Sequence, residues 1–162
     1  MNIIITAPKH LGKSTLIRKI IARLGGSTSG FISEFINRDS PDRVLMIKSI
    51  DGEYSRPVVK WDNEGYHVDY DCFDNFAAEL IDADSDFVVI DELGKFEINC
   101  ENLRNRVTKA FESKCHVIAS VRLDALGWMQ ELKSRNDVCV INLTEENRDE
   151  LDSTIISKLG IV

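Results

Sequence analysis

Apolar and polar positions follow two different periods along the chain, and the alternation between them predicts the order of the elements. Short apolar runs, typical of buried strands, occur at 2–6, 86–92, 116–121 and 138–143. Apolar residues recur every three or four positions, as in amphipathic helices, at 13–24, 72–83, 99–113, 124–134 and 145–159. Strands that alternate with helices of about a dozen residues predict a mainly parallel sheet with helices on both faces, an α/β fold.

The region between the first two helices has a different pattern. Strand-like runs occupy 27–37 and 43–50, and the second run ends at Asp51-Gly52, a dipeptide typical of hairpin turns. The β character continues to about residue 70. We therefore expect an antiparallel β insertion at about 28–70. The chain contains no linker, repeat or low-complexity stretch, so residues 1–162 are predicted to form a single domain.

Composition and charge limit the class of partner. With 162 residues, 43% hydrophobic and 29% charged, the chain is expected to be a globular protein with one substantial core. Its net charge of -7, with both signs mixed along the sequence, predicts no extended basic surface and therefore no nucleic-acid partner. No apolar stretch approaches the roughly 18 residues that span a bilayer, so no membrane partner is expected.

The cysteines and the N-terminus bear on location. The four cysteines are isolated in the sequence, without a C-x-x-C pair or a histidine at ligand spacing, so reduced thiols are expected and a zinc site is not. The chain begins directly with a strand-like run and shows no secretory signal pattern. These observations predict a cytoplasmic protein.

The segment "APKHLGKST", residues 7–15, follows the first strand and leads into the first helix. It resembles the phosphate-binding motif G-x-x-x-x-G-K-[ST], or Walker A, which needs this strand and helix context because loop N–H groups and the helix N-terminus together bind the anion. Gly12 supplies conformational freedom, Lys13 a cation for the phosphates, and Ser14 a hydroxyl for Mg²⁺. The candidate nucleotide-binding residues are Ala7, Pro8, Lys9, His10, Leu11, Gly12, Lys13, Ser14 and Thr15.

A plain turn and helix start would also explain this segment, and a second motif favours phosphate binding. In "FVVIDELGKFE", residues 87–97, Asp91 ends a buried strand and Glu92 follows it. The carboxyl ends of strands are where α/β sheets place groups that contact ligands. Asp91 is a candidate for holding Mg²⁺, and Glu92 for accepting a proton from an attacking water.

Together these motifs resemble the nucleoside-triphosphatase family known from thermophiles, whose vertebrate member is called cancer-related nucleoside-triphosphatase. Further matching stretches are "GFISE" (30–34), "VDYDCF" (68–73), "VIDELGKFE" (89–97) and "RNDVCVINLTEENRDEL" (135–151). The resemblance covers most of the chain, and the part around Asp91 and Glu92 is its most specific stretch.

The resemblance implies a P-loop NTPase fold and Mg²⁺-dependent hydrolysis of ATP, GTP and other nucleoside triphosphates to the diphosphate and phosphate. Carried over by position, Lys13 binds phosphate, Ser14 and Asp91 serve the metal, and Glu92 activates water. Ser120, at the end of a strand, is the candidate for a polar sensor, and Arg122 for transition-state charge.

Some positions depart from the family or have two readings. The family usually has glycine where Ala7 and His10 stand, and its middle region is longer than the one here. Lys95 and Arg135 are further candidates for stabilising charge, although a solvated lysine and an ordinary salt bridge explain them about as well.

Three functions remain open from the sequence. We favour a nucleoside-triphosphatase. A nucleotide or small-molecule kinase is the second, but the segment 124–136 lacks the compact arginine cluster expected of a kinase lid. A nucleotide-binding switch without turnover is the third, and the retained Glu92 counts against it because a protein that only binds needs no base.

Overall fold

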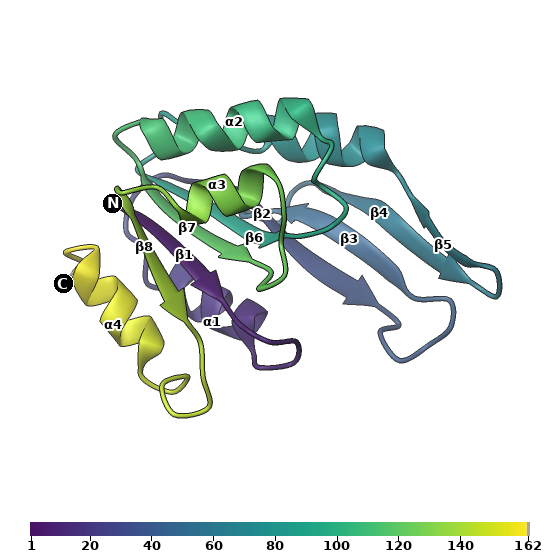
Figure 1. Ribbon diagram of the computed structural model, residues 1–162, viewed down its shortest axis with the longest axis horizontal. Coiled ribbons are helices and arrows are strands. Elements are labelled where there is room, and N and C mark those ends of the chain that lie inside the picture. Colours follow the sequence, from purple (N-terminus) through teal and green to yellow (C-terminus); the bar gives the residue numbers. More distant parts are fainter. Residues whose placement is uncertain (162) are drawn as a thin grey trace.

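The chain folds around one continuous eight-stranded sheet, with strand order β5-β4-β3-β2-β6-β7-β1-β8 (Figure 1). The computed structural model describes residues 1–161. The strands are β1 (Asn2–Thr6), β2 (Thr28–Ile36), β3 (Val44–Ser49), β4 (Ser55–Asp62), β5 (Gly65–Val68), β6 (Phe87–Leu93), β7 (His116–Val121) and β8 (Val138–Asn142). The helices are α1 (Lys13–Ile21), η1 (Cys72–Ala77), α2 (Glu101–Glu112), α3 (Trp128–Lys133) and α4 (Leu151–Lys158).

Five neighbouring strands, β2, β6, β7, β1 and β8, run parallel. All five residues of β1 are buried because the strand lies inside the sheet with a helical layer on each face. The mainly parallel α/β fold expected from the alternating pattern is thus confirmed. Since parallel strands end at the same edge, the residues that follow β1, β6 and β7 meet there.

The antiparallel region begins one strand later than the sequence suggested. β2 pairs parallel with β6 over Thr28–Ile32 and antiparallel with β3 on its other side, so it belongs to both halves of the sheet. Gly30 makes this pairing possible: its φ is +111°, and a Cβ there would lie 1.9 Å from the carbonyl oxygen of Val89. No other residue fits so close to β6.

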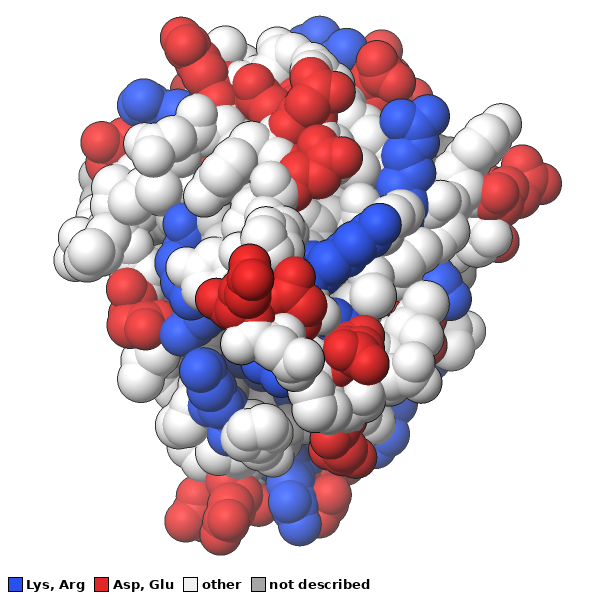
Figure 2. Space-filling model, turned by 90° about the vertical axis from the view of Figure 1, so that its right-hand side faces the viewer, with Lys and Arg blue, Asp and Glu red and all other residues white. Residues whose placement is uncertain are grey.

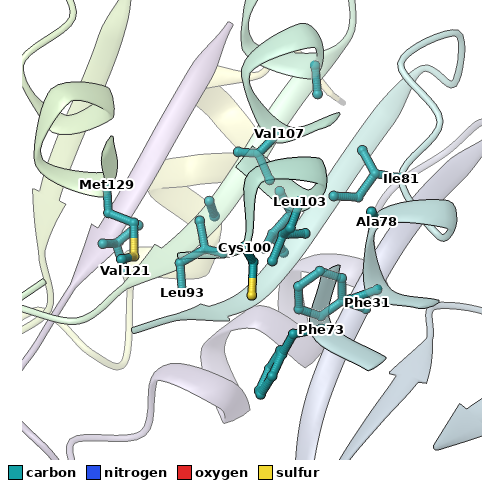
Figure 3. Close-up of a cluster of buried hydrophobic side chains, with 14 of the residues drawn as sticks. Phe31, Phe73, Ala78, Ile81, Leu93, Cys100, Leu103, Val107, Val121 and Met129 are labelled. Atoms are coloured by element: carbon teal, nitrogen blue, oxygen red, sulfur yellow. The ribbon is translucent and has the colours of Figure 1, made fainter. Parts of the chain in front are cut away.

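Helices cover both faces, as predicted. η1, α2 and α3 lie on one face, over a core that includes Phe31, Phe73, Leu103 and Val107 (Figure 3). α1 and α4 lie on the other face, over a separate core that includes Ile5 and Ile155. In the part of the chain that the structure describes, no helix has the length and apolar character needed to cross a bilayer.

The helices are shorter than their periodic patterns. α1 ends at Ile21 rather than 24, because its last turn tightens into bonds from Arg23 N–H to the Ile20 carbonyl and from Leu24 N–H to that of Ile21. α3 begins only at Trp128, after Gly127 with φ +62°. α4 begins at Leu151, because residues 145–150 form turns. The expected 72–83 helix runs over 70–79 instead, with the π-helical segment η1 (Cys72–Ala77) at the centre of that span.

Candidate active site

The phosphate-loop segment has the context that its motif requires. β1 ends at Thr6, residues 7–12 form a loop, and α1 begins at Lys13 immediately after Gly12, whose φ is 94°. The first N–H groups of α1 have no partners within the helix. They are therefore available to bind an anion at the edge of the sheet where the loop lies.

The two departures from the glycine pattern behave differently. Ala7 is buried at 4% exposure against the α1 side of the sheet, and its backbone stays out of the left-handed region. His10 adopts φ 65°, one of two non-glycine residues with positive φ in the described chain. A histidine there costs about 1 kcal/mol or more relative to glycine in backbone strain, so the loop keeps its shape with a bulkier, strained residue.

An ion pair joins the loop to the end of β6. Lys13 Nζ lies 2.8 Å from Glu92 Oε2, and the side chains are 11% and 32% exposed. The β6–β7 pairing shifts register between Ile90 and Leu93, so Asp91 and Glu92 occupy an irregular end of the strand. Two motifs separated by nearly 80 positions are thereby in direct contact.

Asp91 is buried beneath this pair and is held by hydroxyl groups. Ser120 Oγ donates to Asp91 Oδ1 at 2.5 Å, and the Ser14 hydroxyl also donates to the carboxylate. Ser33 Oγ donates to the Asp91 backbone carbonyl at 2.8 Å. Burial raises the pKa of Asp91 above its usual range, while the hydrogen bonds from Ser120 and Ser14 oppose the rise. This is a buried acceptor site with two hydroxyl donors around it.

Arg122 follows β7 and reaches the same place. Its backbone N–H donates to the Leu93 carbonyl at 3.0 Å, and its guanidinium binds both carboxylate oxygens of Asp124 at 3.0 and 3.1 Å. The side chain of Arg122 packs against Gly94, where an added Cβ would lie 2.7 Å from Arg122 Cδ. Gly94 therefore provides the space that lets the arginine lie against the turn after β6.

Sequence reasoning missed one carboxyl group of the site region. Glu97 is 4% exposed, and its Oε2 accepts the Gly94 N–H at 2.9 Å, which closes the turn after β6. The indole N–H of Trp128 donates to the Glu97 carbonyl at 3.3 Å. Burial raises the pKa of Glu97 to about 7, and the nearby Glu92 adds to the rise. The sequence signal was its place in the matching stretch "VIDELGKFE" (89–97), to which no role for Glu97 was attached.

A cavity of about 380 Å³ opens at this edge of the sheet. Its lining brings together the loop, the end of β6 and the segment after β7, namely Ala7, Pro8, Lys9, Lys13, Glu92, Arg122, Leu123 and Asp124. Of the remaining loop candidates, Gly12 and His10 shape the backbone, Ser14 binds Asp91, Leu11 lines a neighbouring cavity and Thr15 is exposed.

Two positive candidates lie elsewhere. Lys95 places its ammonium over the rings of Tyr66 and Phe96, 4.8 and 4.9 Å from their centroids, and does not line the cavity. Arg135 binds Asp137 at 2.8 Å and Glu112 at 3.6 Å, the ordinary salt-bridge reading of that residue. On the face that Figure 2 shows, Lys and Arg lie interspersed with Asp and Glu, without a continuous basic patch among the coloured residues.

The chain is similar over nearly its whole length to proteins of one family. A family model described as NTPase matches residues 2–156. The nucleoside-triphosphatase THEP1 of Thermotoga sp. (strain RQ2) is 30% identical over 168 residues, covering 98% of this chain and 95% of that protein. The cancer-related nucleoside-triphosphatase of Homo sapiens is 26% identical over 180 residues, covering 96% and 95%.

A solved structure has the same fold. The crystal structure of THEP1 from the hyperthermophile Aquifex aeolicus superposes with a TM-score of 0.82 at 26% identity, covering 98% of this chain and 99% of that one. The superposition leaves almost no part of either chain out. The chain belongs to the NTPase family.

Proposed function

We propose that the protein hydrolyses nucleoside triphosphates, ATP and GTP among them, to the diphosphate and phosphate with the help of Mg²⁺. The observation that carries the proposal is the 2.8 Å contact between Lys13 of the phosphate loop and Glu92 at the end of β6. It places a cation for phosphate and a carboxylate for water in one cavity. The printed names of the relatives, nucleoside-triphosphatases from thermophiles and from Homo sapiens, support the same reaction.

Phosphate binding falls to the loop and the start of α1. The unpaired N–H groups of the first helical turn and the backbone around Gly12 offer donors to phosphate oxygens. Lys13 lies in the cavity wall with 11% of its side chain exposed, so its charge acts where water is largely excluded. Pro8 and Lys9 form the outer wall of the same cavity.

The donor set fits Mg²⁺. Asp91 and Ser14 present a carboxylate and a hydroxyl oxygen in mutual contact, the ligand type that Mg²⁺ prefers. In the described residues no three His, Cys, Asp or Glu side chains cluster as a metal site, which suits an ion held by one or two protein ligands, waters and the phosphates of the substrate. When bound, the ion supplies positive charge to the phosphate oxygens as negative charge shifts in the transition state.

Glu92 has the position of a general base. Its side chain is 32% exposed and lines the cavity, so a water between it and the γ-phosphate is sterically possible. As the water oxygen bonds to the γ-phosphorus, the bond to the β–γ bridging oxygen breaks and the water proton passes to Glu92. Phosphate oxygens that bind Lys13 compete with Glu92 for the ammonium group and release the carboxylate for this role.

Arg122 adds positive charge from the other wall. Its guanidinium is held by Asp124, and Arg122 lines the cavity. The arginine is therefore already oriented and needs little reorganisation when negative charge develops on the phosphates. Ser120, instead of contacting the substrate, orients the Asp91 carboxylate through its 2.5 Å hydrogen bond. We assign it a positioning role.

We also propose a cytoplasmic location. All four cysteines are free thiols, and three of them are buried. Free thiols are typical of proteins kept in a reducing compartment.

Product analysis tests the reaction. Purified wild type with Mg²⁺ and each common triphosphate is expected to release phosphate and the diphosphate, and Lys13→Ala and Glu92→Gln are each expected to lose most of that release. Lys19→Ala, an exposed position of α1, and Glu53→Gln, in an exposed turn, are matched controls that keep it. Phosphate transferred only to an added hydroxyl acceptor would identify a kinase, and tight binding without either product would identify a nucleotide switch; both overturn the hydrolase.

A further inference from the structure

A second cavity of about 350 Å³ lies beside the one that holds Lys13 and Glu92. It shares three wall residues with the first, namely Ala7, Pro8 and Leu123, so the two cavities are contiguous. Its other walls come from Thr6 at the end of β1, from Leu11 of the loop, and from the end of β8 and the segment that follows it, residues 142–146. A ligand whose phosphates occupy the first cavity therefore has room for its other end in the second.

The walls nearest the first cavity are apolar. Pro8, Leu11, Leu123 and Leu143 line the second cavity, and Leu123 is 57% exposed although it is a large apolar residue. Exposed apolar side chains at the mouth of a cavity gain free energy when a flat ring covers them. A heterocyclic base has such a ring.

The polar rim is a turn that is already fixed by its own hydrogen bonds. The Leu143 N–H donates to the Thr6 carbonyl at 2.8 Å, and the Thr144 N–H donates to Asn147 Oδ1 at 2.8 Å. The Asn147 side-chain amide in turn donates to the Asn142 carbonyl at 2.9 Å. The turn needs no ordering when a ligand arrives, and several of its donors are already taken.

What the rim offers to a ligand is mainly acceptor oxygen. The two charged residues that line the second cavity are Glu145 and Glu146, and both are carboxylates. A hydrogen bond from the Thr144 hydroxyl lowers the pKa of the exposed Glu146 carboxyl. The Asn142 side-chain amide adds one uncharged donor, and its oxygen already accepts from Thr6 Oγ1 at 2.5 Å. Charge-assisted hydrogen bonds from a ligand's N–H groups are therefore the strongest contacts available.

We propose that the base of the nucleotide occupies the second cavity and that Glu145 and Glu146 select bases with an exocyclic amino group over uracil and thymine. Adenine, guanine and cytosine present N–H₂ groups to a carboxylate, whereas uracil and thymine have a carbonyl oxygen, which the carboxylate repels, where cytosine has its amino group, and keep N3–H as their one donor on that edge. The selection rests on the proposed nucleotide hydrolysis, and it names the substrate class of the same site.

Cytosine and uracil nucleotides give a matched test, because the two bases have the same size and differ at C4, an amino group against a carbonyl, and at the adjacent N3, an acceptor against an N–H donor. A carboxylate near C4 therefore favours cytosine. We expect kcat/KM for CTP to exceed that for UTP by about five- to twentyfold, and CDP to bind more tightly than UDP by a similar factor in calorimetry. Glu145→Gln with Glu146→Gln is expected to bring both ratios close to one. Glu150→Gln, an exposed glutamate of the neighbouring turn that does not line the cavity, is expected to leave them unchanged.

A second pair of variants tests the placement of the base. Leu123→Ala is expected to weaken CDP and UDP alike, by about threefold to tenfold, since it removes apolar wall from the cavity. Leu126→Ala, in the same loop and 61% exposed but not in the wall, is expected to have no effect. Unaltered binding in Leu123→Ala would place the base elsewhere and overturn the proposal.

The measurements also separate this selection from the reaction itself. CDP and UDP binding reads out base preference without any hydrolysis, so it is informative even when no phosphate is released. Equal binding and equal hydrolysis of the two pyrimidine nucleotides, or a ratio that survives the Glu145 and Glu146 changes, would overturn the selection and leave the hydrolase in place. Absence of phosphate release with clear CDP preference would overturn the hydrolase and retain the selection.

Discussion

Lys13 and Glu92 form an ion pair across the floor of the cavity, 2.8 Å between Nζ and Oε2. Phosphates that enter the cavity meet a cation that is already partnered and a carboxylate of like charge. Glu92→Gln removes both obstacles, so we expect it to bind ADP at least as tightly as wild type and up to about tenfold more tightly. Isothermal titration calorimetry measures this, with Glu53→Gln as the control. Weaker ADP binding in Glu92→Gln would mean that the carboxylate supports the loop instead of competing with phosphate.

Ser120 is expected to act through Asp91. Ser120→Ala removes the hydroxyl that donates to Asp91 Oδ1, so the ionised carboxylate loses a partner and holds Mg²⁺ less well. We expect the Mg²⁺ concentration for half-maximal activity to rise about tenfold or more, with a smaller change in kcat at saturating Mg²⁺. Ser33→Ala is the matched control, because Ser33 donates to the backbone carbonyl of the same residue. An equal shift in both variants would show a general loss of packing.

Glu97 is expected to make stability depend on pH. Its pKa is raised from the ordinary 4.5 to about 7 in the folded protein, so its contribution to stability is fully present below about pH 4.5 and is lost as pH rises through 7. Glu97→Gln has no such loss and can still accept the Gly94 N–H. The difference in unfolding free energy between variant and wild type is expected to move in favour of the variant by at most about 3 kcal/mol from pH 4.5 to pH 8.

Urea unfolding at both pH values measures this difference. Comparing the two proteins at each pH cancels the contribution of Asp91, whose pKa is also raised. A difference that stays constant between the two pH values would contradict the titration of Glu97 in this range.

Gly94 is expected to tolerate no side chain. In Gly94→Ala the new Cβ would lie 2.7 Å from Arg122 Cδ, so the arginine side chain must shift, and we expect the shift to disturb its bidentate contact with Asp124. We expect kcat to fall about tenfold or more, because a shift of about 1 Å in a charged group is costly to a transition state. Gly25→Ala, where a Cβ meets nothing within 4 Å, is the control that should keep full activity.

His10 is expected to be sensitive to the shape of its substituent. Its φ of 65° is accessible to glycine without strain and is very unfavourable for a β-branched residue. We expect His10→Gly to change the unfolding free energy by less than about 1 kcal/mol, because the greater conformational entropy of glycine in the unfolded chain offsets the relief of strain, and His10→Val to lower it by about 1–2 kcal/mol. Lys9→Val, at a neighbouring position without positive φ, controls for the added apolar surface. Equal losses in His10→Val and Lys9→Val would contradict a strained loop.

Local pattern was sufficient to predict the order of the elements. β1, β6, β7 and β8 lie within one residue of the expected runs, because buried parallel strands are short and continuously apolar. The ends of the helices were not predictable to the same degree. Gly127 starts α3 late and a hydrogen-bonded turn delays α4, and both depend on contacts that a periodic pattern does not contain.

For the site, the structure brings together the candidates that stand in the two motifs and places elsewhere a candidate whose position depends on a distant segment. Lys13, Ser14, Asp91 and Glu92 come together because β1 and β6 end at the same edge of the sheet. The Lys95 ammonium lies over the ring of Tyr66, nearly 30 positions away in the sequence. This contact depends on the position of β5, which a local sequence pattern does not give. Glu97 stands in the matching stretch 89–97 but was given no role, because its burial and the contact of its backbone carbonyl with Trp128 involve a segment about 30 positions away.

The sharing of β2 between the two halves of the sheet has a mechanical consequence. From β2 the backbone ladder runs through β3 and β4 to the outer strand β5, where Tyr66 touches Phe96, their ring centroids 5.5 Å apart, in the turn that Gly94 and Glu97 close. The antiparallel strands therefore contact this part of the sheet twice: β2 pairs with β6, and Tyr66 of β5 packs against Phe96 in the turn after β6. They brace the carboxylates of β6 from outside the cavity, without contributing a residue to its lining.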